Sequence, residues 1–133
     1  MKSYVIAYLA ALTAFLIIDA VWLGVISKRF YAEQLGSLMR ERVLFAPAAV
    51  FYLIYAAGVV ILAIRPEQPD LSLVQVALLG ALVGFMAYGT YNITNIATLR
   101  DWPVRMSMVD WSWGTVLTSI VAVLGALAVR QFR

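Results

Sequence analysis

Four long stretches of apolar sequence constrain the fold of this chain more than any other feature. They cover residues 5–26, 44–64, 71–99 and 111–129, and together they contain one charged side chain, Asp19. About 20 apolar residues are enough for a helix to cross a bilayer. Of the 133 residues, 64% are hydrophobic and 13% are charged, whereas soluble domains are nearer half apolar and a quarter charged. We therefore predict an integral membrane protein, an all-α bundle of four transmembrane helices.

Proline residues indicate where these helices begin and end. Pro66 and Pro69 block helix continuation between the second and third segments. Pro103 suits the first turn of a helix, so the fourth helix is expected to begin near it and to contain Asp110. The alternative is a helix that begins at Asp110, which then caps it. The single transmembrane domain, residues 1–133, is expected to have helices at about 4–26, 44–64, 71–99 and 103–130.

The first connection has the composition of a short helix lying in the membrane interface. Tyr31, Leu35, Leu38 and Met39 recur at helical spacing, and basic residues flank them on both sides. An apolar face bordered by Lys and Arg is typical of interfacial helices, here over residues 29–42. A solvated loop is the alternative.

The Lys and Arg residues bear on topology and on partners. Six lie in the first and third connections, and four lie in the second connection and at the termini. The positive-inside rule therefore places the first and third connections in the cytoplasm. A difference of two charges leaves dual insertion with antiparallel dimers open. The net charge of +3 follows from these positions at helix ends, and we expect no nucleic-acid partner.

The chain contains no Cys and no His, and this absence excludes several kinds of site. Disulfides, iron–sulfur clusters, His- or Cys-ligated haem and structural zinc sites all lack ligands. Thiol nucleophiles and triads that use a histidine are excluded as well. We expect no metal and no cofactor, and any acid–base chemistry has to use Asp, Glu, Tyr, Lys or Arg.

Polar side chains fall at one depth of the predicted bundle. Asp19 lies late in the first helix and Asp110 early in the fourth, and consecutive helices alternate in direction. Both acids therefore lie in the same half of the membrane, with polar residues of the second and third helices. The candidate ligand- or proton-binding residues are Asp19, Trp22, Tyr52, Tyr55, Tyr88, Tyr91, Asn92, Asn95, Thr98, Asp110 and Trp113. We expect a polar, aromatic-lined pocket near the first and third connections, and we assign no catalytic residue.

Each of these residue types also has a structural explanation. A charged side chain inside the bilayer costs roughly 2.5–3.5 kcal/mol on insertion scales, which favours a functional role for Asp19. Polar side chains also hold helices together, at about 0.6 kcal/mol each. Trp and Tyr gather at membrane interfaces, and this explanation is favoured for Trp102, Trp111 and Trp113.

Small residues recur every four positions on the third and fourth predicted helices. They are Gly80 and Gly84 on the third helix, and Gly114, Thr118, Ala122 and Ala126 on the fourth. Such stripes let helix backbones approach closely. We expect the two helices to pack along them, and a homodimer contact is the alternative use.

Four segments resemble a known family. They are DAVWLG at 19–24, FYLIYAAG at 51–58, AYGTYNITNIATLRDWP at 87–103 and DWSWGTVLT at 110–118. They are similar to the bacterial membrane family called domain of unknown function 2177 (DUF2177), and the resemblance covers essentially the whole chain. It implies a four-helix inner-membrane protein and carries no activity, substrate or cofactor. The positions that match the family pattern are Asp19, Trp22, Tyr91, Thr94, Asn95, Thr98, Trp102, Asp110 and Gly114.

One departure from the family pattern concerns the residue after Tyr91. The chain has Asn92 there, where the family pattern has an acid. If that acid carries a proton or a cation, this chain either lacks the role or relies on Asp19 and Asp110 alone.

Three functions stay open on the sequence alone. The main hypothesis is binding or transport of a small cationic or amphipathic ligand, with Asp19 exchanging a proton for a cation. An accessory or scaffold membrane subunit is the second. The third is a lipid-modifying enzyme with Asp19 and Asp110 as an acid–base pair and Asn95 orienting the substrate. We favour a protein that is not an enzyme, with bilayer lipid and a small amphipathic or lipid molecule as partners.

Overall fold

The computed structural model describes all residues, 1–133, and contains helices and connections without strands. In chain order the elements are α1 (Lys2–Val21), the π-helical turn η1 (Trp22–Ile26), α2 (Lys28–Leu35), the 3-10 turn η2 (Gly36–Leu38), α3 (Phe45–Val59), the π-helical turn η3 (Val60–Ile64), α4 (Leu73–Thr98) and α5 (Val104–Phe132). Four helices are long and apolar enough to cross a membrane: α1 with η1, α3 with η3, α4 and α5. Their limits lie within two residues of those expected from the sequence.

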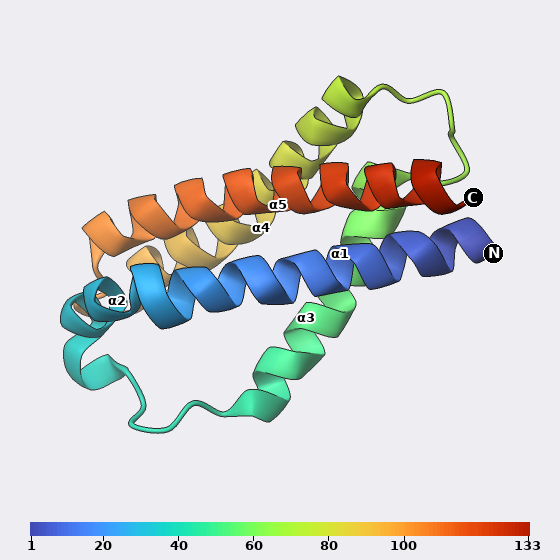
Figure 1. Ribbon diagram of the computed structural model, residues 1–133. Helices are drawn as coiled ribbons and strands as arrows, with labels where there is room; N and C mark the ends of the chain where they lie inside the picture. The colour runs from blue at the N-terminus through green and yellow to red at the C-terminus, as the bar shows by residue number, and fades with distance from the viewer.

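Helices α1 and α5 lie side by side and run in opposite directions, so that both termini are at the same end (Figure 1). Helix α4 packs along α5. Helix α3 crosses the bundle obliquely. Its last turn, η3, contacts α1, α4 and α5, whereas its beginning diverges from the other spans (Figure 1). The middle of α3 contacts α1, where the Tyr8 hydroxyl donates to the Leu53 carbonyl oxygen at 3.0 Å.

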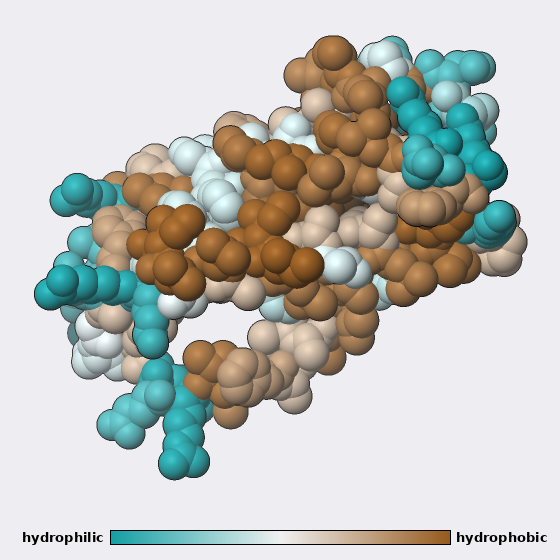
Figure 2. Space-filling model, in the orientation of Figure 1, coloured by the Kyte–Doolittle hydropathy of each residue, from teal (hydrophilic) through white to brown (hydrophobic).

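The outer surface has the polarity of a membrane protein. Large apolar side chains such as Ile17, Ile54 and Leu78 are exposed around the middle of the helices. Figure 2 shows this apolar zone between hydrophilic ends, and it also shows an opening between α1 and the beginning of α3. Because a bilayer solvates apolar side chains, such exposure is expected of helices that span it.

The first connection corrects one expectation from the sequence. Helix α2 ends at Leu35, because Gly36 takes a positive φ of 54° that stops the helix. The predicted helix over residues 29–42 is therefore too long. Leu38 and Met39 are exposed, whereas Tyr31 is buried at 8% exposure, so the four residues do not form one apolar face.

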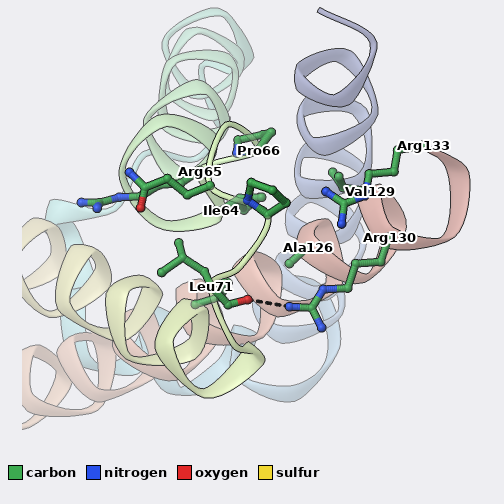
Figure 3. Close-up of a pocket in the computed structure, with 11 residues that line it drawn as sticks. Ile64, Arg65, Pro66, Leu71, Ala126, Val129, Arg130 and Arg133 are labelled. Atoms are coloured by element: carbon green, nitrogen blue, oxygen red, sulfur yellow. Dashed lines mark hydrogen bonds between the residues drawn. The ribbon is translucent and has the colours of Figure 1, made fainter.

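The second connection is a tight turn held against the C-terminal end of α5. Arg130 Nη2 donates a hydrogen bond of 2.6 Å to the carbonyl oxygen of Leu71 (Figure 3). Arg65 ends the preceding helix in a left-handed conformation with φ of 50°. Ser72 and Gln75 then form a capping box that starts α4. This turn fixes the antiparallel path from α3 to α4.

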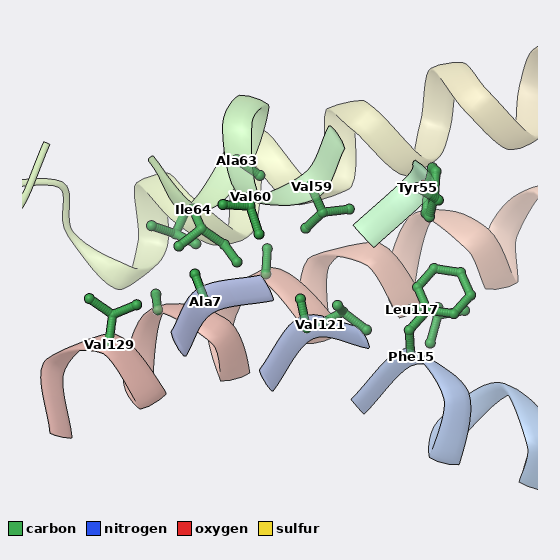
Figure 4. Close-up of a cluster of buried hydrophobic side chains, with 14 residues drawn as sticks. Ala7, Phe15, Tyr55, Val59, Val60, Ala63, Ile64, Leu117, Val121 and Val129 are labelled. Carbon is green, nitrogen blue, oxygen red and sulfur yellow. The ribbon is translucent and has the colours of Figure 1, made fainter. Parts of the chain in front are cut away.

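The buried core lies toward the end of the bundle that carries the termini. Apolar residues of α1, α3, η3 and α5, including Ala7, Val59 and Val121, meet there (Figure 4). Helices α4 and α5 touch through their small residues: a Cβ added at Gly84 would lie 2.3 Å from the carbonyl oxygen of Gly114. The predicted packing of the third and fourth helices along their small-residue stripes is thus confirmed.

Candidate functional site

The candidate site begins with one repeated pattern on two antiparallel helices. The first span and α5 each carry an Asp followed three residues later by a Trp, Asp19 with Trp22 and Asp110 with Trp113. The two indole rings stack with their centroids 4.2 Å apart and their planes 10° from parallel. Trp113 Nε1 donates to Asp19 Oδ1 at 3.2 Å. The Asp–Trp pairs of α1 and α5 are therefore joined by a ring stack and a hydrogen bond.

Asp19 is buried, with 6% of its surface exposed. Its second oxygen, Oδ2, accepts a hydrogen bond of 2.5 Å from the Tyr52 hydroxyl of α3. The ring of Phe15, one turn before Asp19, packs edge-on against Tyr52 with centroids 5.1 Å apart. This contact orients the Tyr52 hydroxyl toward Asp19. Each carboxylate oxygen of Asp19 therefore accepts a hydrogen bond from an uncharged side chain, Oδ1 from Trp113 and Oδ2 from Tyr52.

Asp110 is held by side chains from two other helices. Its Oδ1 accepts from the Tyr31 hydroxyl of α2 at 2.7 Å, and its Oδ2 accepts from Asn92 Nδ2 of α4 at 2.8 Å. Trp22 Nε1 donates to the same Tyr31 hydroxyl at 3.3 Å. Because α5 begins at Val104, Asp110 lies inside the helix, and the alternative in which it caps the helix is wrong.

No basic side chain neutralises either acid. The one ion pair in the structure joins Arg29 to Glu33 at 3.2 Å, on the exposed side of α2. Burial, followed by the hydrogen bond to Asp110, raises the pKa of Tyr31 above its ordinary value, so Tyr31 stays a protonated donor at neutral pH. Moving a carboxylate out of water without a cationic partner costs free energy. Two acids without such a partner are therefore unusual inside a membrane protein.

Both acids line one pocket between the four spans. The pocket has a volume of about 350 Å³, within the range of small-molecule sites. It is lined by Asp19, Leu23, Phe51, Tyr52, Ala87, Tyr88, Tyr91 and Asp110. The pocket thus combines two carboxylates with an aromatic wall.

Gly114 sets the position of one wall of the pocket. A Cβ added at Gly114 would lie 2.0 Å from the ring of Tyr88, so the glycine lets this ring lie directly on the α5 backbone. The ring then faces Tyr55, with centroids 6.2 Å apart. A larger residue at 114 would push Tyr88 into the pocket.

The structure brings eight of the eleven predicted residues together and places three outside the cluster. Asp19, Trp22, Tyr52, Tyr88, Tyr91, Asn92, Asp110 and Trp113 belong to the hydrogen-bond network or line the pocket. Tyr55 is buried in the core and shares a hydrogen bond of 2.8 Å with Thr118.

Asn95 and Thr98 lie outside the cluster, contrary to the expectation that they share its face. Thr98 is exposed and its hydroxyl donates to the Thr94 carbonyl of its own helix at 2.8 Å. Asn95 is half-buried and forms no side-chain hydrogen bond with the network. Both follow Asn92, the last α4 residue bonded to the acids, so they lie nearer the helix end.

Tyr31 belongs to the hydrogen-bond network of the candidate site, although the sequence pattern assigned it elsewhere. The apolar spacing of the first connection put it on an interfacial face, whereas its hydroxyl links Trp22 and Asp110. One feature of the sequence points to this role. Tyr31 is the one tyrosine of the first connection, and buried tyrosine hydroxyls usually form a hydrogen bond.

The donor set of the cluster bears on metals and on the departure at residue 92. No group of three or more acidic side chains lies close enough to hold a metal ion.

Asn92 donates a hydrogen bond to Asp110 through its side-chain amide. An acid at position 92 can donate such a bond only when it is protonated. Asn92 is fully buried and its Oδ1 has no hydrogen-bond partner, although buried polar atoms are normally paired.

The fold and the pocket together define an integral membrane protein of four spans with a paired-acid, aromatic cavity. The chain belongs to the family described as Predicted membrane protein (DUF2177), which matches residues 4–127, so the resemblance of its motifs is confirmed. No curated protein and no solved structure matches the chain.

Proposed function

We propose that this membrane protein binds a small cationic or amphipathic molecule in the pocket between its four spans, as a carrier or receptor. The observation that carries the proposal is the presence of Asp19 and Asp110 in one pocket lining with no basic side chain paired to either acid. In a medium of low dielectric constant, two such carboxylates attract a cation or a proton strongly.

The aromatic wall fits the same class of ligand. Phe51, Tyr52, Tyr88 and Tyr91 line the pocket beside the acids, and aromatic faces attract organic cations, most strongly when the pair is desolvated. A proton and a cationic ligand compete for the negative charge of the same carboxylate. Protonation of Asp19 or Asp110 therefore favours release of the ligand, and release is coupled to proton uptake.

Binding of radiolabelled tetraphenylphosphonium, a lipophilic organic cation, to the purified protein tests the proposal. Wild type is expected to bind it, and Asp19→Asn is expected to weaken binding by roughly tenfold or more, about 1.4 kcal/mol. Asp70→Asn is the matched control, because Asp70 is an exposed acid of the second connection outside the pocket. Absence of binding in wild type, or equal binding by Asp19→Asn, contradicts the proposal.

A scaffold role is the second candidate, and the network itself favours it. The hydrogen bonds of the two acids join α1, α2, α3, α4 and α5. Under this hypothesis Asp19→Asn lowers thermal stability in detergent. Under the binding hypothesis the variant keeps its stability, because it loses a buried charge, and loses the ligand. Unfolding and binding measured on the same sample therefore separate the two.

We further propose that the protein lies in a bacterial inner membrane with its first and third connections in the cytoplasm. The charge bias of six against four supports this orientation. The chain has no cysteine, so single cysteines at the exposed positions Glu41 and Gln68 report topology without background. A membrane-impermeant maleimide added to intact cells is expected to label Gln68→Cys and to spare Glu41→Cys. The reverse pattern, or labelling of both, contradicts the orientation.

A further inference from the structure

A second, apolar groove continues from the acidic pocket along the gap between α3 and α4. Its volume is about 540 Å³, and its walls come from α3, η3 and α4, with Ile54, Leu62 and Leu82 among them. Ala87 lines both the groove and the pocket. The pocket and the groove therefore adjoin at this residue.

The order of lining residues along the helices shows that the groove starts beside the pocket and extends beyond it. On α3 the pocket takes Phe51 and Tyr52 and the groove begins at Ile54. On the antiparallel α4 the pocket extends from Tyr91 to Ala87, whereas the groove extends from Thr90 to Leu79. Twelve residues of helix separate Tyr91 from Leu79, which is roughly 18 Å at 1.5 Å per residue. The pocket and the groove together are thus long and narrow, with the two acids at one end and Arg65 at the other.

We propose that this cavity takes an amphiphile with a cationic head and a single alkyl chain, the head at Asp19 and Asp110 and the chain in the groove toward Leu79. The proposal rests on the proposed function for its head site and adds the class of the ligand. Charge complementarity fixes the orientation, because the two acids at the pocket end attract a cationic head, whereas Arg65 at the far end of the groove repels it. Between Ile54 and Leu62 the α3 side of the groove is apolar apart from the Tyr55 hydroxyl, which is already bonded to Thr118. The divergence of α3 from α4 gives the chain a route from the membrane into the groove.

Gly58 offers a clean way to block the groove alone. It lines the groove, and a Cβ added to it meets nothing within 4 Å, so a larger side chain fills the groove without displacing the protein. Gly24 is the matched control. A Cβ at Gly24 also meets nothing within 4 Å, and Gly24 lines neither the groove nor the pocket.

The experiment measures displacement of radiolabelled tetraphenylphosphonium from protein in digitonin, a detergent without an alkyl chain. The competitors are butyltrimethylammonium and dodecyltrimethylammonium, which share a head and differ in chain length. In wild type and Gly24→Phe the dodecyl compound is expected to be the more potent. Each methylene that loses its apolar contact changes affinity up to roughly fourfold. Gly58→Phe is therefore expected to cut the advantage of the long chain by about tenfold, and Gly58→Leu by less.

The outcomes separate the two proposals. If tetraphenylphosphonium binds wild type and Gly58→Phe alike, and only the long-chain advantage falls in Gly58→Phe, the groove assignment holds. If the long-chain advantage is the same in Gly58→Phe, Gly58→Leu and Gly24→Phe, the groove assignment is overturned while the cation site stands. If tetraphenylphosphonium does not bind wild type, the proposed function itself fails.

Discussion

The two halves of the bundle are held together in different ways. Near the termini, aliphatic side chains and small residues fill the interior, and α4 lies directly on α5 at Gly80, where an added Cβ would meet the Cβ of Ala122 at 2.8 Å. Near the first and third connections, the helices are joined by hydrogen bonds to Asp19 and Asp110 and by the stacked pair of tryptophans. One half is close-packed, and the other encloses a pocket.

The difference shows what a paired-acid site requires of a small membrane bundle. Each carboxylate, Asp19 buried and Asp110 half-buried, takes neutral donors from other helices, and these donors are phenols, an indole and an amide. These side chains are large, so the helices that carry them stand further apart than helices joined through glycine. The close-packed half supplies the packing energy that lets the other half stay open.

The largest effect is expected from overfilling the close α4–α5 contact where the close-packed half meets the pocket half. In Gly84→Ala the new Cβ meets the Gly114 carbonyl oxygen at 2.3 Å, and this atom is backbone and has to move with its helix. We expect a loss of about 3 kcal/mol in the free energy of unfolding, measured by unfolding in mixed micelles. Gly24→Ala, which meets nothing within 4 Å, is the control. Equal stability of the two variants would mean that the backbones are not in contact.

A smaller loss is expected when the polar half loses one donor. Asn92→Leu leaves Asp110 Oδ2 without the hydrogen bond of 2.8 Å that Asn92 donates. Hydrogen bonds to charged groups contribute about 2 kcal/mol, and the same unfolding assay measures the loss. Thr98→Val is the control, because the Thr98 hydroxyl bonds only within its own helix. If Thr98→Val cost as much as Asn92→Leu, the network would not be the source of the effect.

The polar half is also expected to respond to alkaline pH through Tyr31. Burial raises the pKa of this phenol, so above pH ~10 the unfolded chain ionises it while the folded chain keeps it protonated. Stability is therefore lost as pH rises through the ordinary tyrosine range. In Tyr31→Phe the free energy of unfolding should fall less between pH ~10 and pH ~11, by about 1 kcal/mol. Parallel curves for the variant and wild type would contradict the buried position of Tyr31.

The smallest effect is expected from one hydrogen bond across the close-packed half. Ser119 Oγ donates to the Ala77 carbonyl of α4 at 2.8 Å. Ser119→Ala is expected to cost about 0.6 kcal/mol, the average for such bonds between membrane helices. Ser112→Ala removes a hydroxyl that bonds only to Met108 of its own helix and should change the unfolding curve less. A larger loss in Ser112→Ala would show that such bonds do not decide helix association here.

Several features of the candidate site could be predicted from residue spacing. Helix direction alternates along the chain, so the depth of Asp19, Asn92 and Asp110 follows from their distance to the helix ends. A spacing of three residues also put each acid on one helix face with its tryptophan. These relations lie within one helix or follow from chain order, so they need no tertiary contacts.

The pairing of side chains between helices could not be predicted in this way. That Trp113 bonds to Asp19, and that Tyr31 reaches Asp110, depends on how each helix is rotated about its own axis. Asn95 and Thr98 fit the helical spacing and still lie outside the network. Spacing gives the face of α4 on which a residue lies, but it does not show which residues of that face have a partner on another helix.

The sequence by itself determined the membrane as solvent, the four spans and the depth of the two acids, because apolar length and proline position act locally along the chain. Only the tertiary structure decided that α3 diverges from α4 and leaves a cavity with the acids at one end. The splay of a helix is set by contacts between residues far apart in sequence, here the packing of η3 against α1, α4 and α5. No pattern within a single span contains that information.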